Sequence, residues 1–325
     1  MALAIKTLFD KRQRALRRAK FRAWWNGDDF NEEAAVAEIE AKLAQEAAND
    51  TGAEAELFDE PEYELPPRLS ALATLWGEGR VRPGDATADG LEPARLGLAP
   101  EGVLAVLGPG LAAPVIALAD GHGGKIDVFE WREETLEALK HGVAQANLAD
   151  RVAVARIDLE AHVFTPTAYD GLFSTDDFAY CGYPPHLAQQ IMKCLKPGAC
   201  AVVESYVGLR NDGALKTAFA SSFAEPQIRA HSDVLQFFTD AGLTLEADED
   251  LTDEFLSMAR DAFKALGERL TQGGGLEPAA ARELAWEAEA WRVRLKLLAQ
   301  RRLERRRFIL RKPAQDAANA NAPAG

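Results

Sequence analysis

Cysteine, histidine and long apolar runs are all scarce in this sequence. It has 3 cysteines and 5 histidines among 325 residues. The cysteines, at positions 181, 194 and 200, show no CxxC spacing, so we expect them to be small core residues in a reduced, cytoplasmic setting. No His/Cys cluster has metal-ligand spacing, so no metal site is predicted. No apolar run approaches the roughly 20 residues that cross a bilayer.

Several functional signatures are also missing. There is no GxSxG motif, which argues against a serine hydrolase of the common α/β type. At the N-terminus, MALAIKTLFDKRQRALRRAKF has a short apolar stretch followed by its charges, which is not the order of a secretory signal. The net charge of −14 argues against a general nucleic-acid binder.

Charge divides the N-terminal part of the chain into two segments. Residues 1–25 combine basic residues with apolar residues at helical spacing, which predicts a basic amphipathic helix. Two interpretations stay open: the helix docks on a membrane surface or protein partner, or it packs on its own domain. The following acidic segment is rich in Ala and Glu, so residues 1–65 are expected to form a helical arm and linker. The tail, 314–325, is of low complexity and is expected to be disordered.

Residues 66–313 carry the pattern of one α/β domain. In its core, 101–250, apolar runs such as GVLAVLG and ACAVVESYV alternate with amphipathic stretches such as REETLEALKHGVAQANL. This alternation predicts a doubly wound, mostly parallel seven-stranded sheet with helices on both faces. A helical insertion is expected over 253–302, before a last strand at about 305–312.

The stretch VLAVLGPGLAAP places a glycine-rich turn at the carboxyl end of the first predicted strand. Gly108 and Gly110 can accept positive φ angles and let a ligand approach the backbone. The next strand, KIDVFEW, ends at Glu130, where a carboxylate can accept both hydroxyls of a ribose, and Asp158 follows the third strand. Each acid also has a simpler explanation as a turn or cap residue. Their places at the ends of successive strands favour a nucleotide-type ligand.

These motifs resemble the class I S-adenosylmethionine-dependent methyltransferases from roughly Gly102 to Val207. VLAVLGPGLA is similar to that family's glycine loop, VFEW to its ribose-binding motif, and IMKCLKPGACAVVE to its helix–LKPGG–strand signature. The resemblance implies a Rossmann-like methyltransferase fold with S-adenosylmethionine as cofactor. It also implies a set of cofactor-binding residues, namely Leu107, Gly108, Gly110, Ala112, Glu130, Trp131, Asp158 and Ser174.

The sequence departs from the family pattern at three positions. Val106 stands where an acid is usual, Ala112 replaces the third loop glycine, and Ala199 replaces the second glycine of PGG. Two functions therefore stay open. One is methyl transfer to a small-molecule or lipid-like acceptor. The other is a non-catalytic protein of this fold that acts as a cofactor sensor or scaffold through its basic N-terminal helix.

The acceptor is expected at the loop after the fourth strand, YDGLFSTDD. Asp176, Asp177 and Tyr180 are the catalytic candidates, because a base near the methyl group can take the proton of an O–H or N–H acceptor. The two acids can equally be a helix cap or a solvated turn. An NPPY-type sequence, typical of nucleic-acid amino methyltransferases, is absent, which favours a small molecule. In the helical insertion, Trp286 and Trp291 offer either a pocket lining or ordinary helix packing.

Overall fold

The computed structural model describes residues 63–208, 212–272 and 276–314, together with residues 31, 34–37, 39 and 41. The chain divides into two compact units, Met1–Glu62 and Tyr63–Gly325. In the first unit, residues 34–37, 39 and 41 are helical, and Ala34 N donates to Asn31 Oδ1 at 3.0 Å. The basic helix predicted for 1–25, and all but the first residue of the predicted tail, lie outside the described residues.

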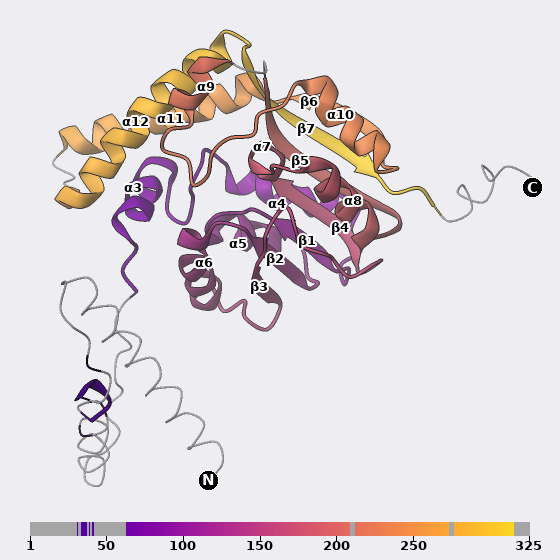
Figure 1. Cartoon of the computed structure of the whole chain (residues 1–325), viewed down its shortest axis with the longest axis horizontal. Coiled ribbons are helices and arrows are strands. Elements are labelled where there is room, and N and C mark those ends of the chain that lie inside the picture. Colours follow the sequence, from indigo (N-terminus) through magenta and orange to yellow (C-terminus); the bar gives the residue numbers. More distant parts are fainter. Residues whose placement is uncertain are drawn as a thin grey trace, which may run out of the picture. The chain divides into compact units, whose positions relative to one another are not determined.

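The second unit contains a seven-stranded sheet with the order β3-β2-β1-β4-β5-β7-β6 (Figure 1). Strands β1 to β5 are parallel, and β7 runs antiparallel between β5 and β6. The strands are β1 (Leu104–Leu107), β2 (Ile126–Glu130), β3 (Val152–Arg156), β4 (Tyr169–Thr175), β5 (Leu195–Gly208), β6 (Thr244–Asp250) and β7 (Leu303–Arg311). The predicted doubly wound, mostly parallel sheet is thus confirmed.

Helices precede the sheet, connect its parallel strands and separate β6 from β7. They are α3 (Pro67–Trp76), α4 (Ala86–Arg95), α5 (Ala112–Asp120), α6 (Glu133–Gln145), α7 (Asp177–Tyr180), α8 (Pro184–Cys194), α9 (Gly213–Ala218), α10 (His231–Asp240), α11 (Thr252–Thr271) and α12 (Pro278–Ala299). The last two form the helical insertion expected before the final strand. Within the described ranges, no helix has both the length and the apolarity of a membrane span.

Each face of the sheet has its own apolar core. On one face, Val106 of β1 packs in a cluster with Val115 of α5. On the other, Leu172 of β4 packs in a cluster with Ile191 of α8 and Phe238 of α10. Because both faces are covered, β1 is buried at every position, which explains why its sequence is apolar without alternation.

A third core lies among α3, α11 and α12, which pack against one another to one side of the sheet (Figure 1). Trp76 of α3 contacts Trp291 of α12, with 4.5 Å between ring centroids, and Phe263 of α11, with 5.6 Å. Trp291 is 1% exposed, whereas Trp286 is 59% exposed. Trp291 therefore serves helix packing, and the two tryptophans do not form a pocket lining.

Candidate functional site

The glycine loop leaves β1 and turns into α5. Gly108 and Gly110 have φ angles of 63° and 83°, in the left-handed region that favours glycine. A Cβ atom on Gly110 would lie 2.4 Å from Cγ2 of Val81, and one on Gly108 would lie 2.3 Å from Oδ1 of Asp177. Both the turn and these two close contacts therefore require glycine.

The connection between α3 and α4 lies across this loop. Gly79 O accepts a hydrogen bond from Ala113 N, in the first turn of α5, at 3.1 Å. Arg82 Nη1 donates to the carbonyl oxygens of Gly108 at 3.3 Å and of Pro109 at 3.0 Å. Burial lowers the pKa of Arg82, although nearby Asp176 opposes this effect. The loop carbonyls thus already bind a cation that the chain itself supplies.

Glu130 ends β2, and its side chain is fully buried. Its Oε2 accepts from Gly110 N at 2.7 Å, and its Oε1 accepts from Arg132 N at 2.8 Å. Arg132 Nη1 also donates to both oxygens, at 2.9 and 3.1 Å. Protein donors therefore occupy both oxygens that were expected to be available to a ribose.

Sequence reasoning missed this role of Arg132. The residue stands at the N-cap of α6, where its side chain makes no capping hydrogen bond. Ser, Thr, Asp or Asn is preferred at such a position. A large cation at the N-cap, two residues after a strand-end acid, was the signal that could have revealed the pair.

Four other residues that were predicted to bind the cofactor lie near the ends of the parallel strands, and their surroundings differ. The ring centroid of Trp131 lies 4.1 Å from the guanidinium carbon of Arg132. The indole Nε1 of Trp131 is buried without a hydrogen-bond partner. Leu107 and Ala112 have buried side chains, so only their backbone atoms can contact a ligand at the loop. Asp158 is exposed and its Oδ1 accepts from Glu160 N at 2.9 Å, which is a turn contact.

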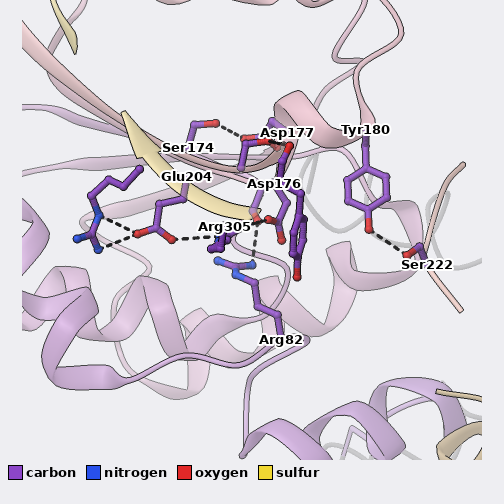
Figure 2. A network of polar contacts seen from close by, with 12 residues as sticks. Arg82, Ser174, Asp176, Asp177, Tyr180, Glu204, Ser222 and Arg305 are labelled. Carbon is purple, nitrogen blue, oxygen red and sulfur yellow. Dashed lines mark hydrogen bonds and ion pairs between the residues drawn. The ribbon is translucent and has the colours of Figure 1, made fainter. Parts of the chain in front are cut away.

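Asp176 and Asp177 follow β4, and the backbone turns sharply between them and the strand. Asp176 has a φ of 70°, a left-handed value that is uncommon outside glycine. Asp177 is fully buried beside Ser174, whose Oγ donates to it at 2.6 Å, while its other oxygen has no partner (Figure 2). Burial raises the pKa of Asp177 to about 7, against the opposing effects of Ser174 and Arg132.

Asp176 has different surroundings from its neighbour. It pairs with Arg305 of β7, whose Nη2 lies 3.1 Å from Glu204 of β5 (Figure 2). Burial alone would raise the pKa of Asp176. The guanidinium groups of Arg305 and Arg82 outweigh that effect, so the pKa is lowered.

A cleft of about 410 Å³, open mouth included, adjoins the glycine loop and the end of β4. It is lined by α3, the α3–α4 connection, α7, residues 221–223 and α12. Asp176 and Tyr180 line it, and Asp177 does not. Tyr180 Oη donates to Ser222 Oγ at 3.0 Å (Figure 2). The other charged residues of the lining are Arg82, Arg132, Glu287 and Arg294.

Comparison with known proteins gives matches in structure and none in sequence. No protein-family model matches the chain, and no curated protein sequence does. The cyclase SpnF matches with a TM-score of 0.60 and 15% identity, over 76% of this chain and 93% of that one. Geranyl diphosphate C-methyltransferase from Streptomyces coelicolor matches with a TM-score of 0.55 and 13% identity, over 80% and 89%. Phosphoethanolamine N-methyltransferase 2 from Haemonchus contortus, in complex with S-adenosyl-L-methionine, matches with a TM-score of 0.67 and 19% identity, over 81% and 61%.

The chain has the class I methyltransferase fold. In this fold the glycine loop, Glu130, Asp176 and the cleft all lie at the carboxyl ends of parallel strands, where open α/β sheets bind ligands. Among the residues that the structure describes, no group of His, Cys, Asp and Glu side chains is arranged to hold a metal ion. The methyltransferase fold thus presents a polar, arginine-rich edge next to a cleft.

Proposed function

We propose that the protein is an S-adenosylmethionine-dependent methyltransferase that acts on a small-molecule acceptor. One observation carries the proposal: the glycine loop and Glu130 adjoin the cleft at a single edge of a methyltransferase-type sheet. Two of the matched structures are named methyltransferases of small molecules, and one of these was determined with S-adenosyl-L-methionine.

The residues at this edge fit the cofactor in chemical type. The carbonyl groups of Gly108 and Pro109 accept N–H groups from a guanidinium, so they also suit an ammonium group. Trp131 Nε1, Thr175 Oγ1 and Asp177 Oδ1 are buried without partners. Buried polar atoms in native proteins are nearly all hydrogen-bonded, so these unpaired atoms at the carboxyl ends of β2 and β4 support a polar ligand at this edge of the sheet.

Glu130 fits the ribose on one condition. Its oxygens are engaged by Arg132, so the hydroxyls of a ribose must replace the Arg132 Nη1 contacts. Arg132 can turn away without a change in the main chain, because its guanidinium is carried on a flexible stem. Leu107, Gly108, Gly110, Ala112, Trp131, Asp158 and Ser174 complete the proposed cofactor site.

Bound S-adenosylmethionine supplies a methyl group that is already activated by a positively charged sulfur. The chain then has to align the acceptor and remove its proton. Asp176 is the proposed base, because it lines the cleft and its lowered pKa keeps it ionised at neutral pH. Burial raises the pKa of Tyr180, so its hydroxyl stays protonated and can orient the acceptor. Asp177 contacts Gly108 and Ser174 instead, so we assign it to support of the loop.

Calorimetric titration with S-adenosylmethionine and S-adenosylhomocysteine tests the proposal. We expect micromolar binding by the full-length protein and a loss of at least tenfold in Glu130→Gln. Glu133→Gln is the matched control, because Glu133 follows closely in the chain but is exposed. Absence of binding by the wild-type protein would contradict the proposed function.

A second function, that of a non-catalytic protein with this fold, is favoured by two specific contacts. The Glu130–Arg132 pair and the Arg82 contacts occupy groups that a cofactor would use. If the protein is a scaffold, neither the wild-type protein nor Arg132→Ser binds S-adenosylhomocysteine, and the protein depends on residues 1–25 to reach its partner. If it is a cofactor sensor, it binds S-adenosylhomocysteine but transfers no methyl group.

A further inference from the structure

The cleft contains two guanidinium groups that form no ion pair among the described residues. Arg82 is half-buried and donates hydrogen bonds only to the loop carbonyls already described, although Asp176, which is paired with Arg305, lies near enough to raise its pKa against the effect of burial. Arg294 of α12 is 5% exposed; its Nε donates to Ala218 O at 3.0 Å and its Nη2 to Ser222 Oγ at 3.3 Å. Charged side chains that are buried in proteins are normally paired, so Arg294 above all leaves positive charge to be balanced.

The surroundings of Arg294 do not neutralise it. Its guanidinium carbon lies 4.1 Å from the ring centroid of Phe219 and 4.2 Å from that of Trp291. Such cation–π contacts stabilise the cation but add no negative charge. Glu287 also lines the cleft, but its Oε1 accepts from Trp291 Nε1 at 2.7 Å and makes no ion pair with Arg294.

The remaining charges of the lining are matched within the protein. Arg132 pairs with Glu130, and Asp176 pairs with Arg305. Within the lining, the guanidinium groups of Arg82, Arg132 and Arg294 outnumber the carboxylates of Asp176 and Glu287, so the lining carries a positive excess.

An independent observation comes from Ser221. This residue is 6% exposed, lines the cleft, and its Oγ has no hydrogen-bond partner. A buried hydroxyl without a partner costs stability unless a ligand completes it. Because a hydroxyl can donate to an oxygen, Ser221 suits the same kind of ligand as the two arginines.

We propose that the cleft holds an anionic group, a phosphate or a carboxylate, of the methyl acceptor through Arg82, Arg294 and Ser221. That the anion belongs to a methyl acceptor rests on the proposed function. That the cleft binds an anion rests on the lining of the cleft alone. The planar guanidinium donors match the paired oxygens of either group. Asp176 and Tyr180 lie on the same lining, so an anion held there would bring the rest of the molecule to the proposed base.

Titration of the full-length protein with inorganic phosphate and with acetate, at constant ionic strength, tests this site. Tryptophan fluorescence is a suitable signal because Trp291 contacts Arg294. We expect saturable binding of at least one anion, and the preferred one distinguishes a phosphate-bearing acceptor from a carboxylate. Arg294→Gln should lower the affinity for that anion by about tenfold or more, as expected for the loss of a charge-assisted hydrogen bond.

Two further variants separate binding from folding. Ser221→Ala should lower the affinity for the anion severalfold. Its melting temperature should be unchanged, because the hydroxyl of Ser221 has no partner in the free protein. Arg292→Gln is the matched control, since Arg292 lies on the same helix but is exposed and paired with Glu289. It should leave the affinity unchanged.

Repeating the titration with saturating S-adenosylhomocysteine separates this proposal from the proposed function. Phosphate or acetate binding that persists supports a site for the acceptor. Complete displacement would overturn it, because the anion site would then belong to the carboxylate of the cofactor. Lack of saturable binding of either anion, or equal weakening by Arg292→Gln, would also overturn it. Anion binding without any S-adenosylhomocysteine binding would contradict the proposed function alone.

Discussion

Asp176 and Asp177 are neighbours in the chain, yet they belong to two different regions. Asp177 lies on the loop side, against Gly108 and Ser174, and burial raises its pKa to about 7. Asp176 lies on the cleft side, paired with Arg305, and its pKa is lowered. Two buried carboxyl groups therefore have pKa values that are shifted in opposite directions, because only Asp176 forms an ion pair with a guanidinium group.

The two regions also differ in how their contacts are distributed along the chain. On the loop side, Glu130 bonds to Gly110 and Arg132, which are 20 and 2 residues away. On the cleft side, Asp176 and Arg305 are separated by 129 residues. The loop side is thus built by consecutive strand–helix units, whereas the cleft side exists only after distant segments have packed together.

Removal of Arg305, on the cleft side, should cause the largest loss in the free energy of unfolding. Arg305→Met leaves Asp176 buried without its ion-pair partner, whereas Glu204 keeps its ion pair with Arg307. Breaking a buried ion pair in this way costs about 3–5 kcal/mol. Urea denaturation measures the free energy of unfolding, with Arg311→Gln at the exposed pair with Glu246 as a control expected to lose less than about 1 kcal/mol. Equal losses in the two variants would contradict the account.

The raised pKa of Asp177 gives the loop side a distinct pH dependence. Between about pH 4 and pH 7 the unfolded chain ionises this carboxyl while the folded protein keeps it protonated, so the free energy of unfolding falls as the pH rises. The upper limit of this fall is ~4 kcal/mol for a shift of about three pKa units. Asp177→Asn removes it, so the variant should gain stability relative to wild type from pH 4 to pH 7. A constant difference across that range would show that Asp177 is ionised in the fold.

Substitution of Gly110, on the loop side, should lower the stability of the protein by a smaller amount. Alanine there has to adopt a φ of 83° and displace Val81, which costs roughly 1–3 kcal/mol. Thermal unfolding should show a lower melting temperature for Gly110→Ala and partial recovery in the double variant with Val81→Ala. Gly213→Ala is the control, because a Cβ there meets no atom within 4 Å. An unchanged melting temperature for Gly110→Ala would show that the loop is not constrained.

The sequence allowed most of the loop side to be predicted, for a physical reason. Parallel strands end at one edge, so the positions of Gly108, Gly110 and Glu130 follow from the alternation of strands and helices. The partner of Glu130 did not follow, because spacing places a side chain at an edge but does not say which way it turns.

The cleft side was predictable only in part. The loop after β4 was expected near the acceptor, and the structure places Asp176 and Tyr180 on the lining of the cleft. Arg82, Ser221 and Arg294 were not, because they come from three segments that reach the edge only through tertiary packing. No periodicity within the chain specifies which of these segments lies over which strand.

The central claim, that the loop side binds S-adenosylmethionine in competition with Arg132, is tested most directly by one titration. Calorimetry with S-adenosylhomocysteine should compare wild type, Arg132→Ser and Glu130→Gln. We expect the serine variant to bind severalfold more tightly, because Glu130 is then free for the ribose and serine is a favourable N-cap for α6. Glu130→Gln should bind at least tenfold more weakly than wild type. Absence of binding in all three proteins would contradict the claim.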